Sequence, residues 1–180
     1  MGLDMFIFKH KRFENATLDD VMAVDYYLDL EQYKKEHPDY KCTMEEWCGK
    51  QKPADNLIEF FGKFWTKEGG HPYEEVAYWR KANQIHKWFV DHVQDGEDDC
   101  GIHRELTKQD LLDLLDYVVV VLRHPATAEK LLPTQSGFFF GEYKYDEYYF
   151  GKLYSTIEQI GRILATTDWK NEALYYVSSW

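Results

Sequence analysis

Two short segments of the sequence hold most of the side chains that could bind a ligand or transfer a proton. In the first, Tyr78 to Phe89, a helix counted at 100° per residue places Asn83 and His86 on or beside the apolar face. Burying either polar group without a partner costs on the order of 1–3 kcal/mol. Each therefore bonds to neighbouring backbone, or lines a pocket in which His86 serves as donor or base.

The second segment, Leu131 to Phe150, combines short polar side chains, two glycines and aromatic rings. Thr134, Gln135 and Ser136 follow a proline turn, and the glycines would let the backbone approach a ligand closely. The aromatic residues of this segment are Phe138, Phe139, Phe140, Tyr143, Tyr145, Tyr148, Tyr149 and Phe150. Together these residues suit a planar, hydrogen-bonding ligand such as a nucleobase. The alternative is a buried strand, an ordinary turn and a capped helix.

A catalytic role would need a proton-transfer group and a residue that orients it. Asp4 lies on an otherwise apolar predicted strand, and a buried acid needs a positive or hydrogen-bonding partner, for which His86 and Arg80 are candidates. This reading predicts a hydrolase or transferase with His86 as general base and Asp4 orienting it. The sequence contains no nucleophile elbow, phosphate loop or dinucleotide fingerprint.

We expect neither a metal nor a cofactor. The histidines and the cysteine near residues 86–103 do not have the spacing of a zinc site. The acidic turn at 95–99 resembles the start of a calcium loop, but Cys100 occupies the glycine position and Leu106 the terminal glutamate position. The acidic turn is therefore expected to face solvent.

Charge and composition limit the partners and the compartment. The net charge of −11 disfavours nucleic acid and anionic membrane surfaces, which attract clustered Lys and Arg. The three cysteines form no C-x-x-C pair, and the sequence lacks a signal-peptide pattern or a long apolar run. We therefore expect a protein with reduced thiols in the cytoplasm, with no membrane partner.

The predicted elements give an α+β fold, a mostly helical single domain over residues 1–180. Three capping boxes predict helix starts at Thr17, Thr43 and Thr107, and Asp146 is predicted to cap a fourth long helix. Further helices are expected at 56–65, from Pro72 to about Val93, at 111–123 and at 126–132. The last long helix carries an apolar seam for packing on another helix, made of Phe150, Leu153, Ile157, Ile160 and Leu164.

The predicted sheet is small. Residues 3–8 are predicted to form a central strand, because both faces of that strand would be apolar apart from Asp4. Residues 135–143 are expected to form a second strand. Residues 174–177 are a possible third, returning beside the first.

The sequence resembles a family of small, functionally uncharacterised proteins encoded by bacteriophages and bacteria. The resemblance is carried by MGLDM at residues 1–5, YWRKANQIHKWF at 78–89, QDGEDDC at 94–100 and LLPTQSG at 131–137. Residues 25–70 do not contribute to it. The family implies no catalytic residues. It implies a phage context and the cytoplasm of a bacterial host, where small accessory proteins often disarm defences, some by sequestering nucleotide signals inside oligomers.

Three functional hypotheses follow from these observations. The first is a phage-type accessory protein, a homo-oligomer that binds and sequesters a small nucleotide-like ligand. Its predicted ligand-binding residues are Arg80, Asn83, His86, Thr134, Gln135, Ser136, Phe138 and Tyr145. The second is the hydrolase or transferase that uses His86. The third is a protein-inhibiting module that presents an acidic, aromatic surface as a decoy.

Overall fold

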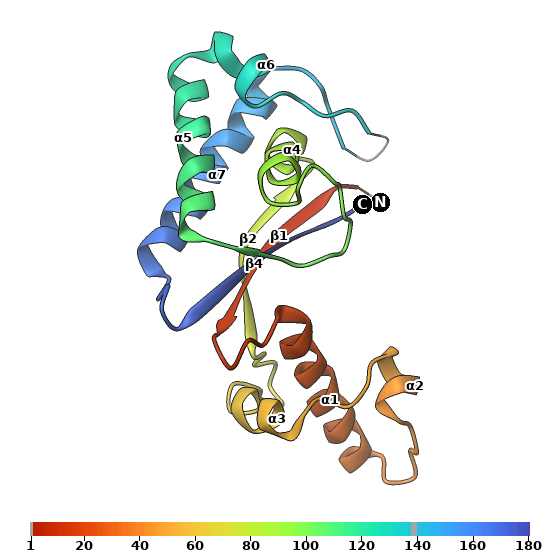
Figure 1. The fold of residues 1–180 in the computed structure, drawn as a ribbon. Helices are drawn as coiled ribbons and strands as arrows, with labels where there is room; N and C mark the ends of the chain where they lie inside the picture. The colour runs from red at the N-terminus through yellow and green to blue at the C-terminus, as the bar shows by residue number, and fades with distance from the viewer. Residues whose placement is uncertain (1, 138–139) are drawn as a thin grey trace. The chain divides into compact units, whose positions relative to one another are not determined.

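The structure is a computed structural model that describes residues 2–137 and 140–180. The chain divides into two compact units. Unit 1 comprises Met1–Phe8, Glu75–Trp169 and Ala173–Trp180, and unit 2 comprises Lys9–Glu74 and Lys170–Glu172. Helices and a sheet are both present, which confirms the α+β class (Figure 1). Across the described residues, every helix is too short or too polar to cross a lipid bilayer.

The sheet has four strands in the order β2-β1-β4-β3. Their bounds are β1 Asp4–Lys11, β2 Tyr73–Arg80, β3 Arg104–Leu106 and β4 Glu172–Ser179. β3 pairs antiparallel with β4. The start of β1 and the end of β4 lie at the same end of the sheet (Figure 1). The prediction of a central N-terminal strand with the C-terminal strand beside it is therefore confirmed.

Helix starts agree with the sequence patterns. The helices of unit 2 are α1 Leu18–Glu36, α2 Met44–Cys48 and α3 Asp55–Phe61. Those of unit 1 are α4 Asn83–His92, α5 Lys108–Arg123, a 3-10 turn Pro125–Thr127, α6 Ala128–Leu131 and α7 Glu147–Thr166. All three capping boxes form with the predicted threonines, and the Asp146 carboxylate accepts hydrogen bonds from the backbone at the start of α7. Each of these helix starts depends on contacts within four residues, so the sequence pattern alone predicts where the helix begins.

The helix expected from Pro72 to about Val93 is wrong in its first half. Residues 73–80 form strand β2, in which Ala77 and Trp79 are buried while Tyr78 and Arg80 are exposed. That alternation is a period of two, and Val, Tyr and Trp favour strands. Lys81 then has a positive φ of 54°, and α4 begins at Asn83. The same residues also fit a helical spacing, which explains the error.

The strand expected at 135–143 is also wrong. None of the described residues of that segment, 135–137 and 140–143, lies in a strand. The segment instead follows an irregular path, and side chains provide several of its hydrogen-bond partners. Two strands that the sequence did not predict, β2 and β3, complete the sheet.

The core of unit 1 joins α4, α5, α7 and the sheet. Leu153 and Ile160 of the predicted α7 seam are buried, and Phe150, Ile157 and Leu164 pack against them. α7 lies beside α5, as Figure 1 shows. From α4, the Phe89 ring stacks on the ring of Tyr176 in β4, with 3.9 Å between centroids. This packing fixes α4 against β4.

Unit 2 has a smaller core. Val21 and Val24 of α1 pack with Phe61 of α3, and the ring of Phe13 stacks on Phe60. α1 also contacts α2. Asp25 directly follows the buried Val24 and is itself 2% exposed.

Candidate functional site

The two segments singled out in the sequence lie against each other in unit 1, and Asn83 joins them. Its Nδ2 group donates to the carbonyl oxygens of Phe140 and Glu142, both at 3.0 Å. Its Oδ1 accepts the backbone N–H of Gln135 at 3.1 Å. Asn83 is 1% exposed, so these bonds are its compensation for burial. Asn83 is therefore a clamp on the backbone of the second segment.

Two glycines in that segment are required by close packing. A Cβ atom on Gly137 would lie 2.7 Å from Cγ of Phe140, so the aromatic ring occupies that space. Gly141 has a φ of 94°, and a Cβ there would lie 3.1 Å from Cβ of Lys81. The glycines thus allow the segment to pack tightly against Phe140 and Lys81. The close approach to a ligand that the sequence suggested stays a prediction.

His86 is completely buried and has hydrogen-bond partners at both ring nitrogens. Nε2 lies 3.0 Å from Oδ2 of Asp98, and Nδ1 lies 2.8 Å from the hydroxyl of Tyr176. An ionised carboxylate only accepts, so Nε2 carries the proton and Nδ1 accepts from the Tyr176 O–H. The result is a directed chain of donors from Tyr176 through His86 to Asp98.

Burial sets the protonation of this chain. Desolvation lowers the pKa of His86, although the Asp98 carboxylate opposes that shift. Desolvation, with Asp98 nearby, also raises the pKa of Tyr176 well above its ordinary value. Both side chains are therefore neutral near pH 7.

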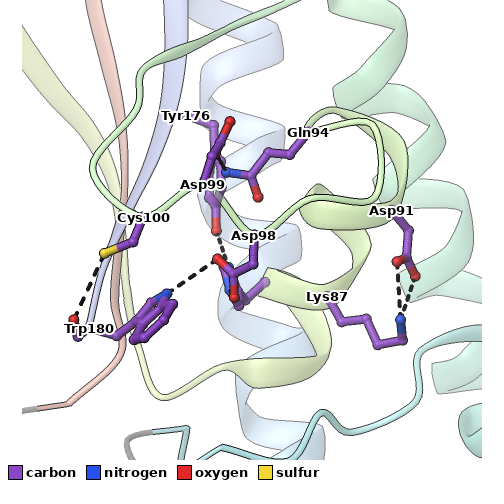
Figure 2. Close-up of polar contacts among 9 residues, drawn as sticks. Lys87, Asp91, Gln94, Asp98, Asp99, Cys100, Tyr176 and Trp180 are labelled. Carbon is purple, nitrogen blue, oxygen red and sulfur yellow. Dashed lines mark hydrogen bonds and ion pairs between the residues drawn. The ribbon is translucent and has the colours of Figure 1, made fainter.

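Asp98 and Asp99 belong to the turn that was expected to face solvent, and that expectation is wrong for these two carboxylates. Asp98 accepts a second hydrogen bond from Nε1 of Trp180, at 3.2 Å (Figure 2). Asp99 bonds to the side chains of Gln94 and Arg104. The turn thereby connects α4 to the C-terminal strand. The motif QDGEDDC was noticed in the sequence, but no local pattern shows which carboxylates turn inward.

The pairing of Asp4 with His86 is wrong. The Asp4 carboxylate accepts a hydrogen bond from the hydroxyl of Tyr78, and Arg80 lies 4.0 Å from it. Of the two partners considered for Asp4, the structure therefore places Arg80 beside it. The carboxylate that contacts His86 is Asp98.

The remaining predicted ligand-binding residues line the second segment or its surroundings. The hydroxyl of Thr134 donates to the carbonyl of Tyr143, and Ser136 is exposed. The hydroxyl oxygen of Tyr145 accepts the Thr134 N–H at 3.4 Å. Phe138 lies outside the described residues. Several aromatic side chains of unit 1 are exposed: Tyr78, Tyr143, Tyr145, Tyr148, Tyr154 and Trp180.

Gln135 is the predicted site residue with an unmet hydrogen-bonding capacity. Its Oε1 atom is buried and has no hydrogen-bond partner among the described residues. Its backbone is held in place by the clamp from Asn83. A buried acceptor without a partner costs about 1–3 kcal/mol, so a donor from a ligand would recover that free energy.

Lowering the pH should weaken the fold through His86. Its pKa is lowered from the ordinary 6.5, so below that pH the unfolded chain binds a proton that the folded protein does not. The stability contribution is therefore present above about pH 6.5 and decreases as pH falls, by at most about 1.4 kcal/mol per unit. Urea unfolding of wild type and His86→Gln, at about pH 7.5 and about pH 5.5, measures it. The variant should lose less stability; equal losses would contradict the assignment.

The described residues contain no cluster of three or more His, Cys, Asp or Glu side chains that could hold a metal ion. The cysteines are not bonded to one another, and Cys100 is exposed beside the backbone of Trp180 (Figure 2). No protein-family model matches the chain, and no curated protein or solved structure matches it either.

Proposed function

We propose that unit 1 binds a small, planar, nucleotide-like ligand at the segment Thr134–Ser136. The observation that carries this proposal is the buried Oε1 atom of Gln135, which has no partner among the described residues. An exocyclic amino group or ring N–H of a nucleobase is a donor of the required kind. Ser136 and the exposed guanidinium of Arg80 would supply further polar contacts.

The exposed aromatic side chains of unit 1 support a planar ligand. Tyr143, Tyr145 and Trp180 are all exposed, and Trp180 is held by the hydrogen bond from its Nε1 group to Asp98. Stacking on an aromatic ring stabilises a bound base by roughly 1–3 kcal/mol. A ring whose orientation is already fixed loses less entropy on binding.

Binding without chemistry is favoured over catalysis by His86. Both of its ring nitrogens already have partners within the protein, Asp98 and Tyr176, so neither is left to take a proton from a substrate. A general base must reach the proton that it removes. Asn83 is likewise saturated by backbone groups. Both residues therefore support the site, and neither is proposed to contact the ligand.

A nucleotide panel tests the proposal. Nucleotides and cyclic nucleotides are added singly to the purified protein and its melting temperature is recorded, because a ligand that binds the folded state stabilises it. At least one should raise the melting temperature, and it should be recovered unaltered after denaturation. A panel in which no nucleotide stabilises the protein would contradict the proposal, and an altered product would indicate catalysis instead.

Gln135→Ala identifies the site. The loss of one hydrogen bond to the ligand should raise Kd about tenfold, equivalent to about 1.4 kcal/mol. Gln109→Ala is the matched control, since Gln109 is exposed on α5 and its side-chain amide donates to Asp113 one helical turn away. Equal ligand affinity in the wild type and both variants would place the site elsewhere.

A further inference from the structure

Unit 2 contains a second arrangement of reactive side chains that the binding proposal does not use. Both carboxylate oxygens of Asp25 lie within 3.1 Å of Nδ1 of His71. Asp25 is buried, whereas the His71 side chain is 48% exposed. The carboxylate therefore fixes the proton on Nδ1 and leaves Nε2 of a neutral imidazole as the basic nitrogen. Nε2 has no hydrogen-bond partner within the described part of the chain.

His71 lines a cavity of about 130 Å³ together with Lys9, Phe64, Tyr73 and Glu172. The cavity belongs to unit 2 alone, because all of its lining residues lie in that unit. Its volume suits a group of a few heavy atoms, smaller than a typical drug-sized ligand. The Phe64 ring supplies an apolar wall, so the cavity combines an imidazole, an ammonium group and apolar surface.

Lys9 supplies a cation whose hydrogen-bonding capacity is not used by its ion pairs. Its ammonium lies 3.5 Å from Glu74 and 3.6 Å from Glu172, farther than most N–H···O bonds reach. Glu172 makes its short contact with Lys11 instead, at 2.7 Å. Glu74 is 67% exposed at its side chain, so water screens its attraction for Lys9. The Lys9 ammonium can therefore donate to an oxyanion in the cavity.

The phenol of Tyr73 keeps its proton. Burial, together with the charge of Asp25, raises the pKa of Tyr73 to about 12. The cavity therefore combines an imidazole oriented by Asp25, the protonated phenol of Tyr73 and the amino group of Lys9. Acyl transfer is assisted by a base that a carboxylate holds in one orientation, and by a cation that stabilises the oxyanion formed in the reaction. This cavity contains groups of both kinds.

We propose that this cavity hydrolyses small acyl esters. Nε2 of His71 takes a proton from a water molecule as its oxygen attacks the acyl carbon. The Lys9 ammonium stabilises the oxyanion that forms on the carbonyl oxygen. The bond from the acyl carbon to the leaving oxygen then breaks, and the proton on Nε2 passes to the leaving oxygen. The products are a carboxylic acid and an alcohol, and His71 returns to its neutral form.

Hydrolysis of 4-nitrophenyl acetate by the full-length protein tests this proposal. His71→Gln should lower kcat/KM by at least tenfold, within the range expected for loss of a general base. His37→Gln is the matched control, because His37 is an exposed histidine of the same unit whose ring bonds to the backbone carbonyl of Tyr33 and stacks on the Tyr33 ring. The control separates the site from the weak reaction of any surface imidazole. Equal rates for His71→Gln and wild type would overturn the proposal.

Asp25 is a positioning residue, and its test separates positioning from folding. Asp25→Asn should lower kcat with little change in KM, since the amide fills the same space but no longer holds the Nδ1 proton. Circular dichroism checks that this variant folds. His71→Gln tests the same site without changing a buried residue, because the His71 side chain is half-exposed.

Lys9→Met should lower kcat, and Lys9→Arg should recover part of it. Normal kcat in both Lys9 variants would also contradict the mechanism.

Discussion

Replacing Asn83 by alanine is expected to lower the free energy of unfolding by about 2–4 kcal/mol. The change removes three hydrogen bonds and leaves the Gln135 N–H and the carbonyls of Phe140 and Glu142 without that partner. Each bond contributes about 0.5–1.5 kcal/mol, and a buried backbone group without a partner costs more. Equilibrium unfolding in urea measures the change. Hydrogen exchange at Gln135 should accelerate because its amide loses its acceptor.

Asn56→Ala is the control for that substitution. Asn56 is exposed, and its amide donates to the exposed carboxylate of Glu14. A change within about 0.5 kcal/mol of wild type is expected there. If Asn83→Ala were equally mild, the clamp would not be what holds the second segment in place.

Replacing His86 by alanine is expected to lower the free energy of unfolding by a similar amount, about 2–4 kcal/mol. It leaves the fully buried hydroxyl of Tyr176 without an acceptor, removes a donor from Asp98 and opens a cavity. Lys87→Ala, one residue along α4, is the control. Lys87 forms a surface ion pair with Asp91 (Figure 2), which contributes at most about 1 kcal/mol. Urea unfolding compares the two variants.

A double substitution shows whether the hydroxyl of Tyr176 is the source of that cost. In the His86→Ala background, Tyr176→Phe removes the group that was left without an acceptor. The second change should therefore cost less there than it does in wild type, with a coupling of about 0.5–3 kcal/mol. Strictly additive effects would show that the two side chains do not act together.

The candidate site was only partly visible in the sequence. The helical count correctly predicted that Asn83 and His86 are buried, although half of the helix on which it was based is strand β2. The correct result follows because α4 itself begins at Asn83, and both residues lie on it. The sequence did not predict that Gln135 lies beside Asn83, because the hydrogen bond between them joins positions 52 residues apart.

The dyad of unit 2 was not anticipated. His71 and Asp25 are separated by 46 residues, and His71 directly precedes Pro72, where the sequence predicted only the start of a helix. No spacing pattern joins two such positions. The burial of Asp25 beside Val24 is the feature that points to this dyad, because a buried carboxylate requires a hydrogen-bonding or positively charged partner.

What the sequence by itself determined are the features encoded by near neighbours. The threonine capping boxes, the Asp146 cap and the apolar seam of α7 all form as predicted, because each depends on residues within a few turns of helix. The N-terminal and C-terminal strands follow from their apolar residues in the same way.

Only the tertiary structure decided the rest. Residues 73–80 fit a helix or a strand, and pairing within the sheet beside β1 selects the strand. His86 finds its hydrogen-bond acceptor 12 residues away in Asp98 and its donor 90 residues away in Tyr176. Local geometry does not encode contacts across such separations. They form because a buried polar group without a hydrogen-bond partner destabilises the folded state. The packing of the helices and the sheet determines which partner lies within hydrogen-bonding distance.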